Sequence, residues 1–168
     1  GLDVPHPYGR TIAGPTAGEG VVVAVASGFQ NRGYTVGIKA GGHGDITTTH
    51  SLWKSTRYSA DCPTPVIVGG HLFSIRDDGM ASCLNLKTGE ALWQERLFTE
   101  NVKVSPVVAA GRVYFTSGRG NTVVAAAAPK FEVLSRNELN EDTLATPAIS
   151  GGRVYLRTEG GLYCFGGR

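Results

Sequence analysis

Histidine and acidic side chains are the first residues of this sequence that could carry chemistry. The histidines are His6, His43, His50 and His71, and no two of them have the H-x-H or H-x-x-x-H spacing of a metal-ligand pair on a regular element. His43 and His50 share the stretch GGHGDITTTH with Asp45. A metal site or a catalytic site is one interpretation of this stretch, and a solvated, glycine-loosened loop is the favoured one.

Three short glycine motifs resemble ligand-binding loops. RDDG at 76–79 lacks the later acidic residues of a calcium loop, so we expect an ordinary hairpin turn there. GEG at 18–20 and GRG at 118–120 precede strand-like sequence, whereas a phosphate-binding loop precedes a helix N-terminus. The nucleophile motif G-x-S-x-G does not occur. The sequence therefore predicts no catalytic, cofactor-binding or metal-binding set of residues.

Length and composition favour one compact domain over residues 1–168. Hydrophobic residues make up 41% of the chain and charged residues 18%, which suits a chain with a substantial core. The net charge of +2 is too small to indicate a nucleic-acid partner. No apolar run approaches the ~20 residues of a membrane span. The N-terminal GLDVPHPYGR lacks the charged start and apolar core of a signal peptide.

A repeated segment organises the chain. TPVIVGGHLFSI, SPVVAAGRVYFT and TPAISGGRVYLR begin at Thr64, Ser105 and Thr146, at intervals of 41 residues, and a weaker copy begins at Gly14. The first interval is 50 residues, which fits an insertion through SGFQNRG and GGHGDITTTH. Each copy has a proline at its second position, which marks the start of a strand where a missing N–H is tolerated. These prolines are Pro15, Pro65, Pro106 and Pro147.

Each copy predicts short strands separated by glycine turns. An apolar run follows the proline, and then comes an alternating stretch such as RVYFTS, which is typical of a half-buried strand. A third strand follows in every copy, and three copies carry a fourth: HSLWKST, EALWQER and FEVLSRN. Four antiparallel strands in a repeat of ~40 residues are the signature of a β-propeller blade. We therefore predict an all-β propeller with blades over about 11–57, 58–98, 99–139 and 140–168.

The two tryptophans occupy one repeated position. Trp53 and Trp93 are 40 residues apart, and Leu134 follows Trp93 by 41 residues, in the outer strand of each blade. A repeated position indicates a repeated packing need, here the docking of one blade against its neighbour. Burial of large aromatic side chains dominates such packing. Stacking on a ligand is the alternative role for these tryptophans.

The cysteines Cys62, Cys83 and Cys164 are odd in number, which rules out complete pairing within the chain. Cys83 and Cys164 each follow a turn glycine by four residues, so they occupy the same position in blades two and four. We expect both to be small, buried packing residues. With blade three between them, they are too far apart to form a disulfide with each other.

The sequence around Trp93 resembles the PQQ-like, or quinoprotein-type, β-propeller repeat family. The blade of that family carries the docking motif A-x-D-x-x-T-G-x-x-x-W. Here CLNLKTGEALW matches it at Thr88, Gly89 and Trp93, with Cys83 and Asn85 in the Ala and Asp places. The third blade has lost the motif. The resemblance extends over about residues 14–165, and the style of the chain also resembles the propellers of planctomycete-type bacterial proteins. The predicted blade-docking residues are Trp53, Thr88, Gly89, Trp93 and Leu134.

The resemblance implies a choice of functions. Members of the family include quinone-dependent dehydrogenases and outer-membrane assembly lipoproteins. The dehydrogenases often have a vicinal disulfide over the cofactor, and this chain has no Cys-Cys pair. We therefore expect a non-catalytic scaffold without a cofactor, which binds a protein or a carbohydrate. The alternatives are a fragment of an oxidoreductase with PQQ and calcium, and a glycan-binding propeller. The resemblance also implies a periplasmic or extracytoplasmic location.

The number of blades raises a question about the ring. The family's rings usually have seven or eight blades, whereas this chain encodes four, and its last blade ends at GGLYCFGGR without an outer strand. The chain is expected to be part of a longer propeller, to form a homodimer that completes an eight-bladed ring, or to close alone. For either open arrangement, the end faces of blades one and four are expected to expose apolar side chains.

Overall fold

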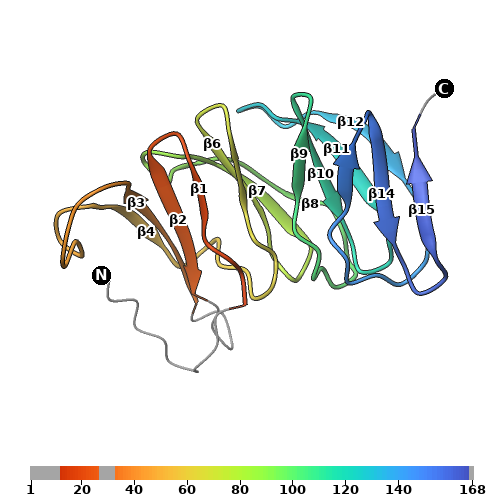
Figure 1. Cartoon of the computed structure of the whole chain (residues 1–168), viewed down its shortest axis with the longest axis horizontal. Coiled ribbons are helices and arrows are strands. Elements are labelled where there is room, and N and C mark those ends of the chain that lie inside the picture. The colour runs from red at the N-terminus through yellow and green to blue at the C-terminus, as the bar shows by residue number, and fades with distance from the viewer. Residues whose placement is uncertain (1–11, 27–32, 167–168) are drawn as a thin grey trace.

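The computed structural model describes residues 12–26 and 33–166, and its regular elements are all β-strands (Figure 1). Residues 1–11, which include His6, and residues 27–32, which hold most of the predicted insertion SGFQNRG, lie outside the described residues. Blade one contains β1 (Thr16–Gly18), β2 (Val21–Ala26), β3 (Tyr34–Lys39) and β4 (Ser51–Ser55). Blade two contains β5 (Val66–Val68), β6 (His71–Ile75), β7 (Met80–Asn85) and β8 (Ala91–Arg96). Blade three contains β9 (Val107–Ala109), β10 (Arg112–Thr116), β11 (Thr122–Ala126) and β12 (Val133–Asn137), and blade four contains β13 (Ala148–Ser150), β14 (Arg153–Arg157) and β15 (Leu162–Phe165).

Each blade is an antiparallel meander, which confirms the predicted propeller fold. Three sheets have four strands in chain order, and the fourth sheet contains β13, β14 and β15. Each innermost strand begins directly after a repeat proline, where the absent N–H costs no ladder hydrogen bond. Many of the described turns between strands contain a glycine with a positive φ, such as Gly79 at 81° in the RDDG hairpin.

The four sheets stand side by side in chain order, and their facing sides form the core (Figure 1). Between blades one and two lie Val23, Trp53, Leu72 and Leu84. A larger cluster between blades two and three gathers aromatic side chains from both blades, including Phe73, Trp93 and Phe115. The strand alternation explains this arrangement, because successive residues of one strand point to the two neighbouring seams.

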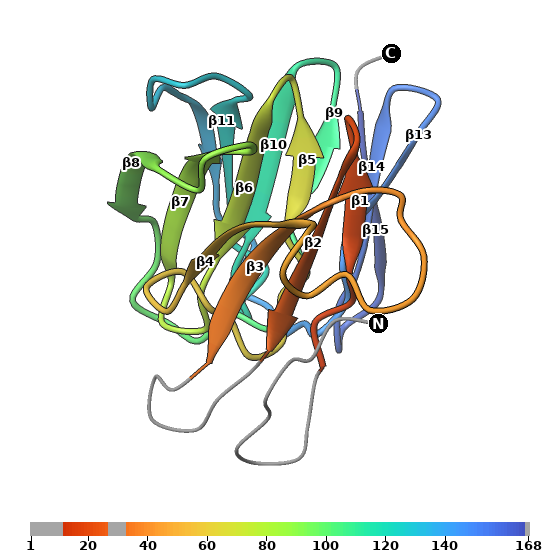
Figure 2. The same ribbon diagram turned by 90° about the vertical axis from the view of Figure 1, so that its left-hand side faces the viewer.

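The free side of blade one is covered, which corrects the expectation that both end faces expose apolar side chains. Tyr34, Val36 and Ile38 of β3 point away from blade two, yet they are buried. The segment 40–50 between β3 and β4 folds across this side (Figure 2), and Ile46 packs on the cluster. The stretch GGHGDITTTH therefore covers the end blade through Ile46, while most of its residues, including His43 and Asp45, stay exposed as expected for a solvated loop.

Blade four is exposed on its free side, and this changes the surroundings of one cysteine. Cys164 pairs with Tyr155 as Cys83 pairs with Phe73, so the predicted equivalence of the two cysteines is confirmed. Cys83 is buried, whereas Cys164 is exposed because no blade covers it. The expected burial was wrong for Cys164, since a packing position is buried only where a neighbour exists. All three cysteines are free, as expected for Cys83 and Cys164.

No helix in the described ranges is long and apolar enough to cross a bilayer.

The two equivalent cysteines should differ in reactivity. Burial raises the pKa of the Cys83 thiol to about 12. Only the deprotonated thiolate reacts as a nucleophile with an alkylating reagent. We expect iodoacetamide to modify Cys164 in the native protein while Cys83 stays unmodified as the pH is raised from 7 to about 9, below the raised pKa. Mass mapping after trypsin digestion measures both sites. In denaturant all three cysteines should react, and native modification of Cys83 would contradict the buried seam.

Candidate functional site

The indole of Trp53 crosses the seam from blade one to blade two. Its Nε1–H donates to the carbonyl oxygen of Leu86 at 2.9 Å. Gly89 lies directly beneath the ring, because a Cβ at this position would be only 2.5 Å from Trp53 Cδ2. The indole therefore docks on the Thr-Gly turn of the following blade, and a side chain at Gly89 would displace it.

The turn that receives Trp53 is held by its own side chains. Asn85 Oδ1 accepts hydrogen bonds from the amides of Lys87 and Thr88, at 3.0 and 3.1 Å. Gly89 N donates to the carbonyl of Asn85 with a φ of 72°, a conformation that favours glycine. Asn85 thus takes the place of the motif's aspartate, because its side-chain oxygen can accept both of these backbone hydrogen bonds.

Trp93 makes the corresponding contact from blade two to blade three. Its Nε1–H donates to the carbonyl of Ala128 at 3.2 Å. Its ring lies 5.0 Å from the Phe131 ring and 6.0 and 6.4 Å from the rings of Phe73 and Phe115. Blade three lacks the Thr-Gly turn, and Phe131 supplies the surface on which Trp93 packs. Both indole N–H donors are therefore bonded to the backbone of the next blade.

Leu134 does not occupy the tryptophan position. Gly37, Cys83 and Val124 occupy the same position in the third strand of blades one, two and three. Trp53 lies opposite Gly37 and Trp93 opposite Cys83, whereas Ser135 lies opposite Val124. Leu134 falls in the β-bulge and is 46% exposed. It shares the bulge position with Leu52 and Leu92. The 41-residue spacing suggested the wrong position because blade three has one additional residue between its last two strands.

A ladder of hydroxyl groups also joins the blades. Gly14 N donates to Thr64 Oγ1 at 2.8 Å, Thr64 N to Ser105 Oγ at 3.0 Å, and Ser105 N to Thr146 Oγ1 at 3.3 Å. Each bond joins equivalent positions of successive blades, directly before the repeat proline. A hydroxyl residue recurs there in three copies, and this signal could have revealed the ladder.

The histidines that the sequence singled out do not converge. In the capping segment, Asp45 Oδ1 accepts bonds from the amide and hydroxyl of Thr47, at 2.9 and 2.7 Å. These Thr47 bonds lower the pKa of Asp45, with burial opposing them slightly. His50 Nδ1 lies 2.8 Å from Thr49 Oγ1. His71, at the start of β6, has a buried Nδ1 without a hydrogen-bond partner. The segment therefore contains a local Asx turn at Asp45.

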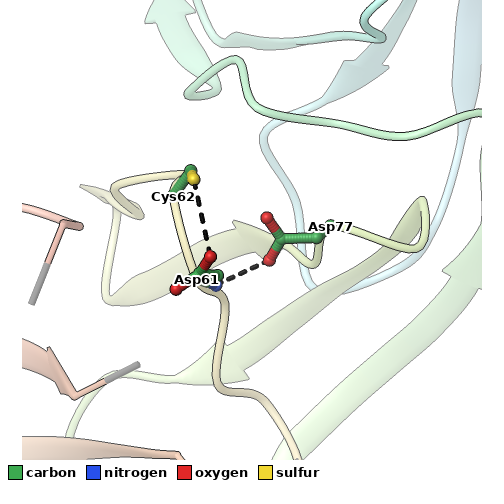
Figure 3. A group of neighbouring side chains, drawn as sticks. All are labelled: Asp61, Cys62 and Asp77. Carbon is green, nitrogen blue, oxygen red and sulfur yellow. Dashed lines mark hydrogen bonds between the residues drawn. The ribbon is translucent and has the colours of Figure 1, made fainter. Parts of the chain in front are cut away.

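Asp61, Cys62 and Asp77 bring potential metal ligands together, with their ligand atoms within 4.8 Å of one another (Figure 3). Asp61 N donates to Asp77 Oδ2 at 2.6 Å, and the Cys62 thiol lies 3.8 Å from Asp61 Oδ2. Burial is the main reason that the pKa of Cys62 is raised, and the neighbouring carboxylates add to this effect. Lys103 Nζ already occupies the position of a cation, 2.9 Å from Asp77 Oδ1.

This cluster does not fit the calcium ion of quinone-dependent enzymes. Calcium takes about six to eight oxygen ligands, whereas the cluster offers two carboxylates and a protonated thiol. Burial lowers the pKa of Lys103, but Asp77 more than offsets this effect, so the pKa is raised and the ammonium persists. We interpret the cluster as an ion pair that ties together two inter-blade connections and the RDDG hairpin.

The RDDG motif forms a local turn, and Glu141 hydrogen-bonds to a neighbouring hairpin. In the RDDG hairpin, Arg76 N bonds to the Met80 carbonyl, which confirms the expected turn. Glu141 accepts hydrogen bonds from the hydroxyls of Thr158 and Tyr163. These bonds, that of Tyr163 first, lower the pKa of Glu141. Such exposed contacts join a blade connection to the next hairpin.

Comparison with known proteins assigns this set of docked blades to a family. A family model described as outer membrane protein assembly factor BamB matches residues 44–130 and 77–165. The chain belongs to this PQQ-like propeller family. No curated protein matches the sequence.

Solved structures of PQQ-like and designed propellers share the fold. BamB from Moraxella catarrhalis is 16% identical with a TM-score of 0.68, over 87% of this chain and 42% of BamB. Quinohemoprotein alcohol dehydrogenase from Comamonas testosteroni is 18% identical with a TM-score of 0.59, over 77% of this chain and 21% of the enzyme. The computationally designed Ika4 protein is 13% identical with a TM-score of 0.75, over 98% of this chain and 94% of Ika4. The chain thus spans less than half the length of BamB.

Removal of the Trp93 ring should strongly destabilise the fold. The Trp93→Ala change leaves a cavity among three phenylalanine rings, so we expect a loss of about 3–5 kcal/mol in the free energy of unfolding. Urea denaturation measures this loss. Leu92→Ala, at the exposed neighbouring position, is the control. A loss below about 1 kcal/mol for Trp93→Ala would instead indicate a ring that is available to a ligand.

The contact of Trp53 with the turn can be isolated by a pair of glycine substitutions. Gly89 and Gly111 have φ values of 72° and 71°, but only Gly89 has the indole above it. Alanine in this conformation costs roughly 1–2 kcal/mol, and overpacking adds about 1–3 kcal/mol. We expect Gly89→Ala to lower the free energy of unfolding more than Gly111→Ala does. Equal losses would mean that Trp53 does not rest on this turn.

Proposed function

We propose that this PQQ-like domain is a binding scaffold for a protein partner, and that its blade-four face is covered either by that partner or by a further blade of the same protein. The exposed side of blade four supports this proposal. Leu162 is 72% exposed there, whereas Ala81, at the equivalent position in blade two, is fully buried against blade three. A face of the kind that packs against a neighbour elsewhere in the molecule is thus presented to solvent.

The side chains of this face suit a protein interface. Tyr155 and Leu162 lie beside Cys164, and two exposed arginines, Arg153 and Arg157, alternate with Tyr155 along β14. Tyrosine and arginine are enriched in protein interfaces and in their hot spots. The arginines favour a partner with acidic residues that surround an apolar contact.

A second copy of the chain is a less favoured occupant of this face. Closure of an eight-bladed ring would require blade four to pack on the free side of blade one, which segment 40–50 covers. Pairing of two blade-four faces would bring like-charged arginines together. A homodimer therefore requires either the cap to move or the arginines to find other partners.

The family relationship supports the rest of the proposal. The matching family is described by the name of an outer membrane protein assembly factor, so we propose a periplasmic or other extracytoplasmic location and a protein partner. We also propose that the domain works without PQQ or calcium, because the candidate cluster found in residues 12–26 and 33–166 already holds the Lys103 ammonium. The competing proposal, a part of a quinone-dependent oxidoreductase, rests on the likeness to the alcohol dehydrogenase fold.

A charge placed in the open face should abolish partner docking. We expect the 168-residue chain, used as an affinity bait in extracts of its source cells, to retain specific proteins that Leu162→Asp does not retain. The matched control is Leu52→Asp, which changes another exposed leucine far from blade four. Light scattering reports self-association, and a species near twice 17.7 kDa would identify a second copy as the occupant. Identical capture by all three proteins, or bound-quinone absorbance after mixing with PQQ and calcium, would contradict the scaffold proposal.

A further inference from the structure

A cavity of about 450 Å³ opens at the outer rim between blades two and three. It lies where the end of β8 and the connection 97–100 meet the start of β11 and the end of β12. Its volume falls in the range of small-molecule sites. The polar side chains in its lining are chiefly Arg96, Glu100, Asn121, Arg136, Asn137 and Glu138.

Three of these polar residues, Arg96, Asn121 and Arg136, differ in kind from the equivalent residues of the preceding blade. In the strand pairing, Arg136 lies opposite Val123 as Gln94 lies opposite Ser82, so Gln94 is its equivalent in blade two. By the same registers Asn121 corresponds to Met80, and Arg96 corresponds to Thr56 of blade one. Structural contacts of this fold recur from blade to blade. Glu100 does recur, as Glu141, which accepts a hydrogen bond from Thr158 as Glu100 does from Ser117. The positions that do not recur are Asn121 and Arg136, and they carry the argument for a ligand.

Asn121 and Glu100 are held in fixed positions on one wall of the cavity. Asn121 Oδ1 accepts bonds from the amides of Leu139 and Asn140, at 3.0 and 3.1 Å. Its Nδ2 donates to Glu100 Oε1 at 3.3 Å. Burial raises the pKa of Glu100, but backbone N–H groups and the side chains of Ser117 and Asn121 outweigh this effect, so the pKa is lowered. A carboxylate acceptor is therefore present in a defined orientation.

The two arginines supply donors from both sides of the cavity. Arg96 is anchored, since its Nη1 donates to the Asp78 carbonyl at 2.6 Å. Arg136 forms no ion pair with any described residue, so its guanidinium donors remain available. Two arginines face two glutamates, Glu100 and Glu138, and the formal charges of this lining cancel. A balanced lining gives no net attraction for an anion or a cation.

We propose that this cavity binds an uncharged sugar, of monosaccharide or disaccharide size. Guanidinium and carboxylate groups make strong hydrogen bonds to neighbouring hydroxyls. Leu97, Phe98 and Val123 form the apolar floor of the cavity and are only 8%, 6% and 2% exposed, so the polar groups supply most of the contact with a sugar. The proposal is independent of protein docking, because the blade-four face lies on the other side of blade three.

Saturation-transfer NMR with the whole chain tests this site. The probes are glucose, galactose, mannose, N-acetylglucosamine and cellobiose, with inorganic phosphate and acetate as anionic comparisons. We expect at least one neutral sugar to receive saturation. We expect Arg136→Ala to weaken its binding at least about tenfold, the effect of losing a charge-assisted hydrogen bond.

The matched control is Gln94→Ala, which removes the equivalent side chain from blade two and should leave the sugar affinity unchanged. A second variant, Asn137→Ala, should also weaken binding. Thermal unfolding verifies that all variants remain folded. The proposal is overturned if no neutral sugar binds, if Arg136→Ala and Gln94→Ala bind equally well, or if only phosphate or acetate shows binding that depends on Arg136.

Discussion

Burial of one blade against the next is the constraint on which the whole structure depends. A sheet of three or four short strands is stable only when its apolar face is covered. Each internal seam is therefore filled from both sides, and the indoles of Trp53 and Trp93 extend the contact to the outer strands. The turn geometry of residues 85–89 and the covered free side of blade one both follow from this need.

The sequence predicted the features that repeat at equivalent positions. The prolines, glycine turns and alternating strands recur with the period of a blade, so strand order and the propeller fold were accessible from spacing alone. The blade type came from the resemblance of the motif around Trp93 to a known family. The docking of Trp53 and Trp93 was also within reach, because a repeated aromatic indicates repeated packing. The position of Leu134 could not be predicted from spacing. Leu134 is the unpaired residue of a β-bulge, and a bulge shifts the strand pairing by one residue relative to the sequence count.

Other features depend on neighbours that no single segment reveals. Cys83 and Cys164 occupy one strand position, yet only Cys83 has a blade against it. Segment 40–50 carries no periodic pattern, so its packing on Tyr34 and Val36 could not be read from the sequence. The rim cavity likewise combines residues from two blades, and it became visible only when the seam was formed. Since propellers host many functions, these irregular positions carry more functional information than the regular ones.

The hydroxyl ladder gives the row of blades a direction. In each of the first three blades the backbone N–H of the residue before the proline donates a hydrogen bond to the side-chain hydroxyl of the equivalent residue in the following blade. The bonds therefore all run in the same direction along the chain. Blades two and three thus contain both halves of this contact, an amide donor and a hydroxyl acceptor, whereas blade one contributes only the amide of Gly14. Interactions of such arrays run only between neighbours. Duplication of a repeat such as blade two or blade three can therefore lengthen the row while this contact is kept, although the tryptophan of each new seam must find its own docking surface.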